Sequence, residues 1–169
     1  MKNWFSSDYH LGHANIIKYC ERPFTNVEEM NEVIIKNHNE RVRDEDTVFF
    51  LGDFCFRNSP GGKEGEGALN KAEYYIKQLN GNFVFIKGNH DRNNSLKTPI
   101  ERVVIKYGGK KICMVHNPVH ADSNYELNLC GHVHEKWKVR GKNINVGVDQ
   151  WGFRPVSFHE ILKIIKGNK

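Results

Sequence analysis

Short apolar runs and segments of helical spacing alternate through the first half of the chain. Val27, Met30 and Ile34 recur at the spacing of one helix face, and Thr25 or Asn26 can cap the helix that they predict. In order, the pattern predicts a strand at Trp4–Phe5, a helix over Val27–Val42, a strand at Thr47–Leu51, a surface loop at Ser59–Gly67, a helix over Ala68–Leu79 and a strand at Asn82–Lys87. Strands that alternate with helices in this way predict a parallel sheet with right-handed connections.

The second half has a different pattern, in which strand-like runs follow one another without a helix between them. Gly108-Gly109 separates two of these runs and predicts a hairpin. The predicted strands are Arg102–Tyr107, Lys110–His116, Leu127–Cys130 and Asn143–Val148, and a helix at Ser157–Ile165 follows Pro155. We therefore expect an antiparallel second half, and two sheets with helices on their outer faces. Without a repeat or a linker, residues 1–169 are expected to form one domain.

The composition is that of a folded chain with a small excess of positive charge. Hydrophobic residues make up 38% of the 169 residues, which argues against intrinsic disorder. No apolar run approaches a membrane span, and the start of the chain lacks the apolar core of a signal peptide, so we expect a cytoplasmic protein. The 4 cysteines lie far apart and are expected to be reduced thiols. The net charge of +5 is spread along the chain, which suits an anionic substrate without indicating nucleic acid.

Histidine and acidic residues gather where the predicted strands end. The clusters are Asp8-Tyr9-His10, Gly52-Asp53, Gly88-Asn89-His90-Asp91, His116 and Gly131-His132-Val133-His134. Taken singly, an aspartate or asparagine after a strand is often a cap or a turn residue, and a histidine pair can simply be exposed. Ligands bind beyond the carboxyl ends of strands in open α/β sheets, so the shared position of these clusters predicts one common site.

The residue types in these clusters suit metal ions. On extended backbone, residues two apart point the same way, so Asp8 and His10 can reach one metal or two neighbouring metals, as can His132 and His134. Carboxylate oxygen and imidazole nitrogen suit divalent Mn, Fe, Co, Ni or Zn. Because no cysteine lies in the motifs, a closed structural zinc site is not expected. A glycine before Asp53, Asn89 and His132 permits close approach of the backbone.

The motifs DxH, GD, GNHD, a lone His and GHxH, in this order over residues 8–134, resemble those of the calcineurin-like metallophosphoesterase superfamily. The opening SDYHLGHANIIKYCERPF is similar to small phosphoesterases of bacteria and their phages. The resemblance implies a four-layer α-β-β-α sandwich, with two mixed β-sheets flanked by helices and two divalent metal ions at the sheet ends. It also implies the ligands: Asp8, His10 and His134 for one metal, Asn89, His116 and His132 for the second, and Asp53 as the bridge between them.

The expected reaction is metal-dependent hydrolysis of a small phosphomonoester or phosphodiester. A hydroxide that bridges the two metals would attack phosphorus, and His90 would stabilise the transition state or protonate the leaving oxygen. Asp91 is expected to orient His90. His13 and Arg57 are further candidates for substrate contact, although a loop histidine and a solvated arginine are the plainer interpretations.

Two other functions stay open at this point. A nuclease of the same superfamily would bind DNA with a strong salt dependence, but the charge of +5 is not clustered and the chain has no length for an added DNA-binding domain. A non-catalytic interaction module would be expected to have lost ligands or His90, and all these positions are present. The substrate, the metal and the oligomeric state cannot be predicted from these residues.

Overall fold

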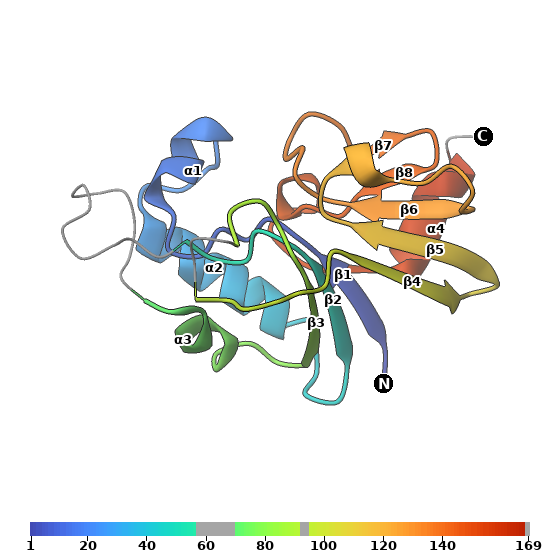
Figure 1. Cartoon of the computed structure of the whole chain (residues 1–169). Helices are drawn as coiled ribbons and strands as arrows, with labels where there is room; N and C mark the ends of the chain where they lie inside the picture. Colours follow the sequence, from blue (N-terminus) through green and yellow to red (C-terminus); the bar gives the residue numbers. More distant parts are fainter. Residues whose placement is uncertain (57–69, 92–94, 168–169) are drawn as a thin grey trace.

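Two mixed β-sheets lie beside one another in the computed structural model of the chain (Figure 1). The structure describes residues 1–56, 70–91 and 95–167. The loop expected at Ser59–Gly67 and the candidate Arg57 lie outside the described residues. No helix among the described residues has the length and apolar composition needed to cross a membrane.

The first sheet is built from the apolar runs of the N-terminal half. β1 (Asn3–Ser6), β2 (Thr47–Leu51) and β3 (Asn82–Ile86) are parallel, so the predicted parallel core is confirmed. β9 (Val156–Ser157) extends the sheet antiparallel to β1, in the order β3-β2-β1-β9. Parallel strands end at a common edge, so the loops that follow β1, β2 and β3 begin side by side.

The second sheet departs from the expected antiparallel arrangement. β4 (Arg102–Tyr107) and β5 (Lys110–Val115) form the predicted hairpin, but β5 is parallel to β6 (Leu127–Cys130) and β6 is parallel to β8 (Asn143–Asn145). β7 (Val139–Arg140) adds an antiparallel edge. The expectation was wrong because residues 116–126 and 131–142 are long enough to return the chain to the same end of the sheet. As a result, β6 and β8 both end beside the loops of the first sheet, where Ser7 pairs with Gly147 and His132 N donates to Asp8.

The predicted helices are present near their expected positions, but their lengths differ from the predicted ones. α2 (Val27–Asn39) is capped by Asn26, whose Oδ1 accepts from Glu29 N at 2.8 Å, but it ends before the predicted Val42. α3 (Ala72–Ile76) is shorter than predicted because turns follow it, and α4 (Phe158–Gly167) begins one residue later than predicted. α1 (Ala14–Tyr19) was not predicted, since a helix of 6 residues that buries Ile16 shows no periodicity. Short 3-10 helices lie at Pro118–His120 and Val148–Gln150.

Apolar side chains cover both faces of the first sheet. On one face Phe50 packs in a cluster with Met30 of α2, and on the other Phe5 packs with Met114 of β5. α4 adds Phe158 to the cluster that lies between the sheets. Figure 1 shows α1, α2 and α3 on one side of β1–β3 and the second sheet on the other. The expected fold class, two mixed sheets flanked by helices, is confirmed.

Candidate metal centre

The loops after β1 and β2 run together immediately beyond the first sheet. Asp8 N donates to Gly52 O at 3.0 Å, and His10 N donates to Asp53 O at 3.1 Å. The φ angles of Asp8, His10 and Asp53 are 59°, 51° and 55°, in the left-handed region that side chains other than glycine rarely adopt. The extended backbone expected for Asp8-x-His10 is therefore wrong, because left-handed turns aim these side chains.

The same correction applies to the loop after β6. His132 and His134 have φ angles of 70° and 44°, so this pair is not extended either. Strained backbone of this kind is concentrated at functional sites in proteins, where the surrounding structure holds it in place. Here the holding contacts include His132 N, which donates to Asp8 Oδ2 at 3.0 Å. The loops after β1 and β6 are thereby joined.

A first group of side chains comes from the loops after β1 and β6. Ligand atoms of Asp8, His10 and His134 all lie within 4.8 Å of one another. His134 Nε2 is 3.9 Å from Asp8 Oδ1, and Ser7 Oγ hydrogen-bonds to the second oxygen of that carboxylate. These are the three side chains expected to hold one metal.

A second group of the same size lies on the side of β5. Ligand atoms of Asp53, His116 and His132 lie within 4.8 Å of one another. The side-chain oxygen of Asn89 is 2.9 Å from His116 Nε2 and 2.8 Å from His132 Nδ1. The structure therefore brings together the side chains expected to hold the second metal.

Asp53 connects the two groups. Its Oδ2 lies 3.6 Å from His10 Nε2 in the first group and 3.3 Å from His116 Nε2 in the second. Its other oxygen accepts from the backbone N of His90 at 2.9 Å, which fixes the carboxylate. One oxygen atom thus faces both groups, which is the position that a bridging ligand requires.

Ring nitrogens of two histidines face the centre and are available to bind cations. His10 Nε2 is buried and has no hydrogen-bond partner among the described residues. His116 Nδ1 lies 2.7 Å from Leu51 O, and donation to this carbonyl turns Nε2 toward Asp53 and Asn89. A ligating histidine characteristically donates its other ring nitrogen in this way. The donor set of imidazole nitrogen, carboxylate oxygen and amide oxygen therefore fits divalent ions from Mn to Zn.

The pKa values of two histidines of the centre are raised by neighbouring carboxylates, whereas burial lowers those of His10 and His132. Burial alone would lower the pKa of His116, but Asp53 and Asp8 raise it to about 9. Burial is likewise outweighed at His134, where Asp149 and Asp8 raise the pKa to about 10. Protons thus occupy places that a cation would take, and they must leave when it binds.

Two glycines allow the backbone to pack directly on ligand carboxylates. A Cβ atom at Gly131 would collide with the side chains of Ser7 and Asp8, and one at Gly88 would collide with Asp53. The close approach expected before His132 and Asn89 is confirmed at both positions.

Asp149 and Arg22 belong to the centre but were missed by the sequence interpretation. Asp149 Oδ2 lies 2.9 Å from His134 Nδ1, and Arg22 donates to the two oxygens of Asp149 at 2.8 Å and 3.0 Å. Arg22 Nη2 also donates to the backbone oxygen of Asp8 at 2.7 Å. Asp149 follows a predicted strand, as the other candidates do, so the same rule could have found it. Arg22 lies in the segment CERPF, whose sequence does not indicate a role for the arginine.

His90 and Asp91 lie next to the centre with different contacts. The ring of His90 is exposed, and its centroid is 5.4 Å from that of His10. Asp91 is buried, and its carboxylate accepts from the backbone nitrogens of Asp53 at 3.0 Å, Phe54 at 3.2 Å and Gly88 at 2.7 Å. These contacts make Asp91 a positioning residue for the loop that carries Asp53, and its expected role in orienting His90 stays a prediction.

His13 lies behind His10 and not in an exposed loop. Its Nδ1 is 3.2 Å from His10 Nδ1, and its ring stacks on Phe56 with centroids 4.6 Å apart. Burial lowers the pKa of His13 to about 4, so its neutral ring can accept a hydrogen bond from His10. The contact supports a role in orienting His10.

Other polar and aromatic residues near these motifs lie in the core or in the loop after β5. Trp151 Nε1 donates to Asn145 O at 2.8 Å, and Trp137 packs against the cluster formed by Cys113, Val115 and Cys130. Asp122 Oδ1 accepts from Asn124 N at 2.9 Å in a turn.

Comparison with known proteins places the chain in a family. A profile of the calcineurin-like phosphoesterase superfamily domain matches residues 1–147. The uncharacterized protein MJ1445 of Methanocaldococcus jannaschii is 41% identical over 180 residues, which cover 99% of this chain and 93% of that protein. The gene 66 protein of Mycobacterium phage L5 is 24% identical over 96% of this chain and 93% of its own length.

A solved structure agrees with the sequence comparisons. The crystal structure of AQ665, a protein of unknown function from Aquifex aeolicus, is similar with a TM-score of 0.71 and 25% identity. The match covers 96% of this chain and 98% of that one. With a family profile that spans most of the sequence, the chain belongs to the calcineurin-like phosphoesterase superfamily.

Proposed function

We propose that the protein is a dinuclear metal-dependent phosphoesterase that hydrolyses a phosphodiester or a phosphomonoester at this centre. The observation that carries the proposal is the position of Asp53, whose Oδ2 lies 3.6 Å from His10 Nε2 and 3.3 Å from His116 Nε2. A single oxygen that faces two groups of ligands suits a pair of ions. Manganese is the first ion to test, and the cytoplasm is the compartment that we propose.

Two divalent ions in these groups would supply an activated water and neutralise charge on the phosphate. The ligands include two carboxylates, Asp8 and Asp53, so the loaded centre stays positive and attracts an anionic ester. Asp91 and Arg22 hold the loops in place, because both bind the backbone beside a ligand. The protein thereby fixes the centre before substrate arrives, which is the basis of electrostatic catalysis.

His90 is the proposed proton donor. Its exposed ring lies beside His10, and its backbone is anchored to Asp53. In the reaction the oxygen of a water molecule forms a bond to phosphorus, the ester P–O bond breaks, and the protonated imidazole of His90 gives its proton to the leaving oxygen. The proton lost by the water returns the imidazole to its starting state through solvent.

The test is hydrolysis of bis-p-nitrophenyl phosphate and p-nitrophenyl phosphate by metal-stripped protein supplied with Mn²⁺, Ni²⁺ or Zn²⁺. We expect metal-dependent turnover that Asp53→Ala abolishes and that His90→Ala lowers. Because p-nitrophenolate leaves readily without a proton, the effect of His90→Ala should stay below the roughly 10²–10⁴-fold of full general acid catalysis. His159→Ala, an exposed histidine on α4, is the matched control and should keep the wild-type rate. Absence of turnover on both esters with every metal would contradict the proposal.

A further inference from the structure

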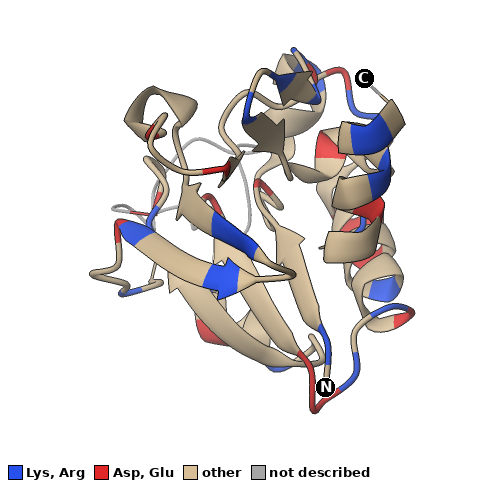
Figure 2. Ribbon diagram, turned by 90° about the vertical axis from the view of Figure 1, so that its right-hand side faces the viewer, with Lys and Arg blue, Asp and Glu red and all other residues tan. Residues whose placement is uncertain are grey.

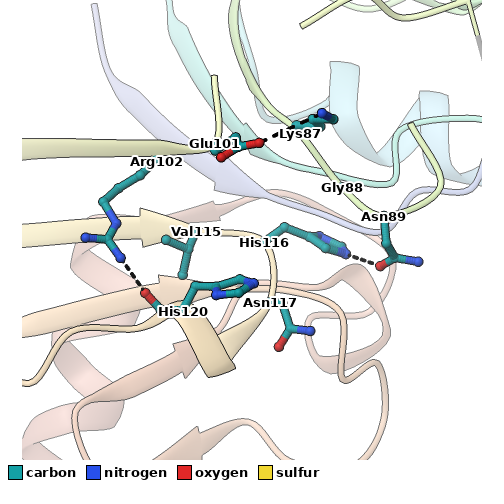
Figure 3. Close-up of a pocket in the computed structure, with 9 residues that line it drawn as sticks. All are labelled: Lys87, Gly88, Asn89, Glu101, Arg102, Val115, His116, Asn117 and His120. Atoms are coloured by element: carbon teal, nitrogen blue, oxygen red, sulfur yellow. Dashed lines mark hydrogen bonds and ion pairs between the residues drawn. The ribbon is translucent and has the colours of Figure 1, made fainter. Parts of the chain in front are cut away.

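A cavity of about 630 Å³ lies beside the second ligand group, and Asn89 and His116 line it (Figure 3). The other walls come from the end of β3, the start of β4 and the loop after β5. Small-molecule sites commonly have volumes of about 300–1,000 Å³. A phosphate ester held at the second group therefore has room for one of its substituents in this cavity.

The ring of His90 lies toward the first ligand group, and His90 is not among the residues that line the cavity. The ring centroid of His90 is 5.4 Å from that of His10 and 6.2 Å from that of His13, both in the loop after β1. If His90 protonates the leaving oxygen, the leaving group faces that loop. The substituent that stays on the phosphate then faces the cavity. A monoester has no such substituent, so the cavity favours a diester.

The charges in the cavity favour an anionic substituent. Two basic residues, Lys87 and Arg102, line the cavity, and Glu101 is the single acidic residue among the described residues that line it. Lys87 Nζ is 3.9 Å from Glu101 Oε1, and the side chain of Glu101 is 80% exposed against 30% for Lys87. An exposed ion pair at this distance contributes little, and the carboxylate is largely in water. The cavity therefore presents a net positive charge.

Arg102 is an exposed residue, and one hydrogen bond orients its guanidinium while other donors stay available. Its Nη2 donates to His120 O at 2.8 Å, which ties the start of β4 to the loop after β5 (Figure 3). A guanidinium carries about five N–H donors, and the described residues accept from Nη2 only. A side chain that is already positioned loses less freedom when it binds a carboxylate or phosphate.

We propose that this cavity binds the half of a phosphodiester that stays on the phosphate, and that this half carries an anionic group recognised by Arg102 and Lys87. The inference rests on the proposed function and narrows it to a diesterase. The anion is a carboxylate or a phosphate, which share the guanidinium as a partner.

The test uses three diesters that share p-nitrophenol as the leaving group. Their retained halves are 4-carboxybenzyl, 4-phosphonobenzyl and the uncharged 4-carbamoylbenzyl, so the chemistry at the leaving oxygen is the same. We expect KM to be about tenfold lower for at least one anionic ester, as one charge-assisted hydrogen bond would give. The anion with the lower KM identifies the recognised group.

Variants on β4 and β3 then locate the effect. Arg102→Gln should raise KM for the anionic ester toward the value of the carbamoyl ester and so reduce the preference, and Lys87→Gln should act in the same direction. Lys106→Gln is the matched control, because it removes an exposed charge from the same strand outside the cavity. Equal KM values for all three esters in the wild type, or a preference that neither Arg102→Gln nor Lys87→Gln reduces, would overturn the inference.

The outcome separates this inference from the proposed function. Turnover without a preference overturns the inference alone, whereas loss of all turnover overturns the function. In the latter case the cavity is tested by calorimetry with 4-carboxybenzyl and 4-carbamoylbenzyl phosphate. Tighter binding of the carboxylate by the wild type but not by Arg102→Gln would support the cavity as an anion site, and equal binding would reject it.

Discussion

Arg22 and Asp149 form a buried ion pair between residues 127 positions apart in the sequence. Their side chains are 0% and 4% exposed, so the pair has lost most of its contact with water. Burying two charges costs free energy that their attraction does not always offset. The pair serves to position two metal-ligand candidates. Arg22 binds the backbone oxygen of Asp8, and Asp149 binds Nδ1 of His134. Asp8 and His134 are members of the first ligand group.

Replacing Asp149 should therefore weaken metal binding without removing a ligand. Asp149→Asn loses the carboxylate that accepts from His134 Nδ1, so Nε2 of the ring becomes less basic and less fixed. We expect Mn²⁺ affinity at the first group to fall about 10–100-fold, as for other partners behind a ligating histidine. The measurement is calorimetric titration of metal-stripped protein. Asp44→Asn, at an exposed loop position, is the control, and a folded Asp149→Asn protein with wild-type affinity would contradict the role.

At the scale of elements, α4 is joined to the first sheet by a reciprocal cap. Ser157 N donates to Glu160 Oε2 at 2.9 Å, and Glu160 N donates to Ser157 Oγ at 3.3 Å. Such a capping box satisfies backbone donors at the start of a helix. Arg41, which follows α2, donates to the same Glu160 oxygen at 2.6 Å. One carboxylate therefore links α4, β9 and the end of α2.

The cap predicts a dependence of stability on pH. Burial would raise the pKa of Glu160, but the bonds from Ser157 and Arg41 outweigh it and lower the pKa to about 2 from 4.5. A carboxyl group with a lowered pKa stabilises the fold above its unfolded pKa, and the contribution is lost as the pH falls toward the folded value. Wild type should exceed Glu160→Gln in free energy of unfolding at pH 6, and the difference should shrink below pH 4.5.

Urea unfolding of both proteins at several pH values measures this difference. Glu45→Gln, at an exposed position between α2 and β2, is the control and should show no pH-dependent change. A difference between wild type and Glu160→Gln that stays constant down to pH 3 would contradict the cap.

At the scale of the whole molecule, the parts that depend on local pattern could be predicted and those that depend on the path of loops could not. β2 and β3 are continuous apolar runs, and their loops carry motifs with a characteristic spacing. The direction of β6 depends on the route of residues 116–126, which no local pattern records. Similarly, the left-handed turns at Asp8 and His134 are imposed by contacts between loops, and Arg22 meets Asp149 only in the folded chain.

Charge at this scale agrees with a small substrate. Figure 2 shows Lys and Arg interspersed with Asp and Glu over the sheets and helices of the side that it draws. The net charge of +5 is thus distributed, whereas nucleic-acid binding typically uses a basic patch or stripe. Positive charge is instead available locally, in the cavity that Arg102 and Lys87 line.

Anomalous diffraction from crystals of the protein loaded with Mn²⁺ tests the dinuclear centre most directly. We predict two peaks about 3.5–4 Å apart, the separation typical of two-metal sites. One should lie against Asp8, His10 and His134, the other against Asn89, His116 and His132, with Asp53 between them. A single peak, or two peaks that do not share Asp53, would contradict a dinuclear centre.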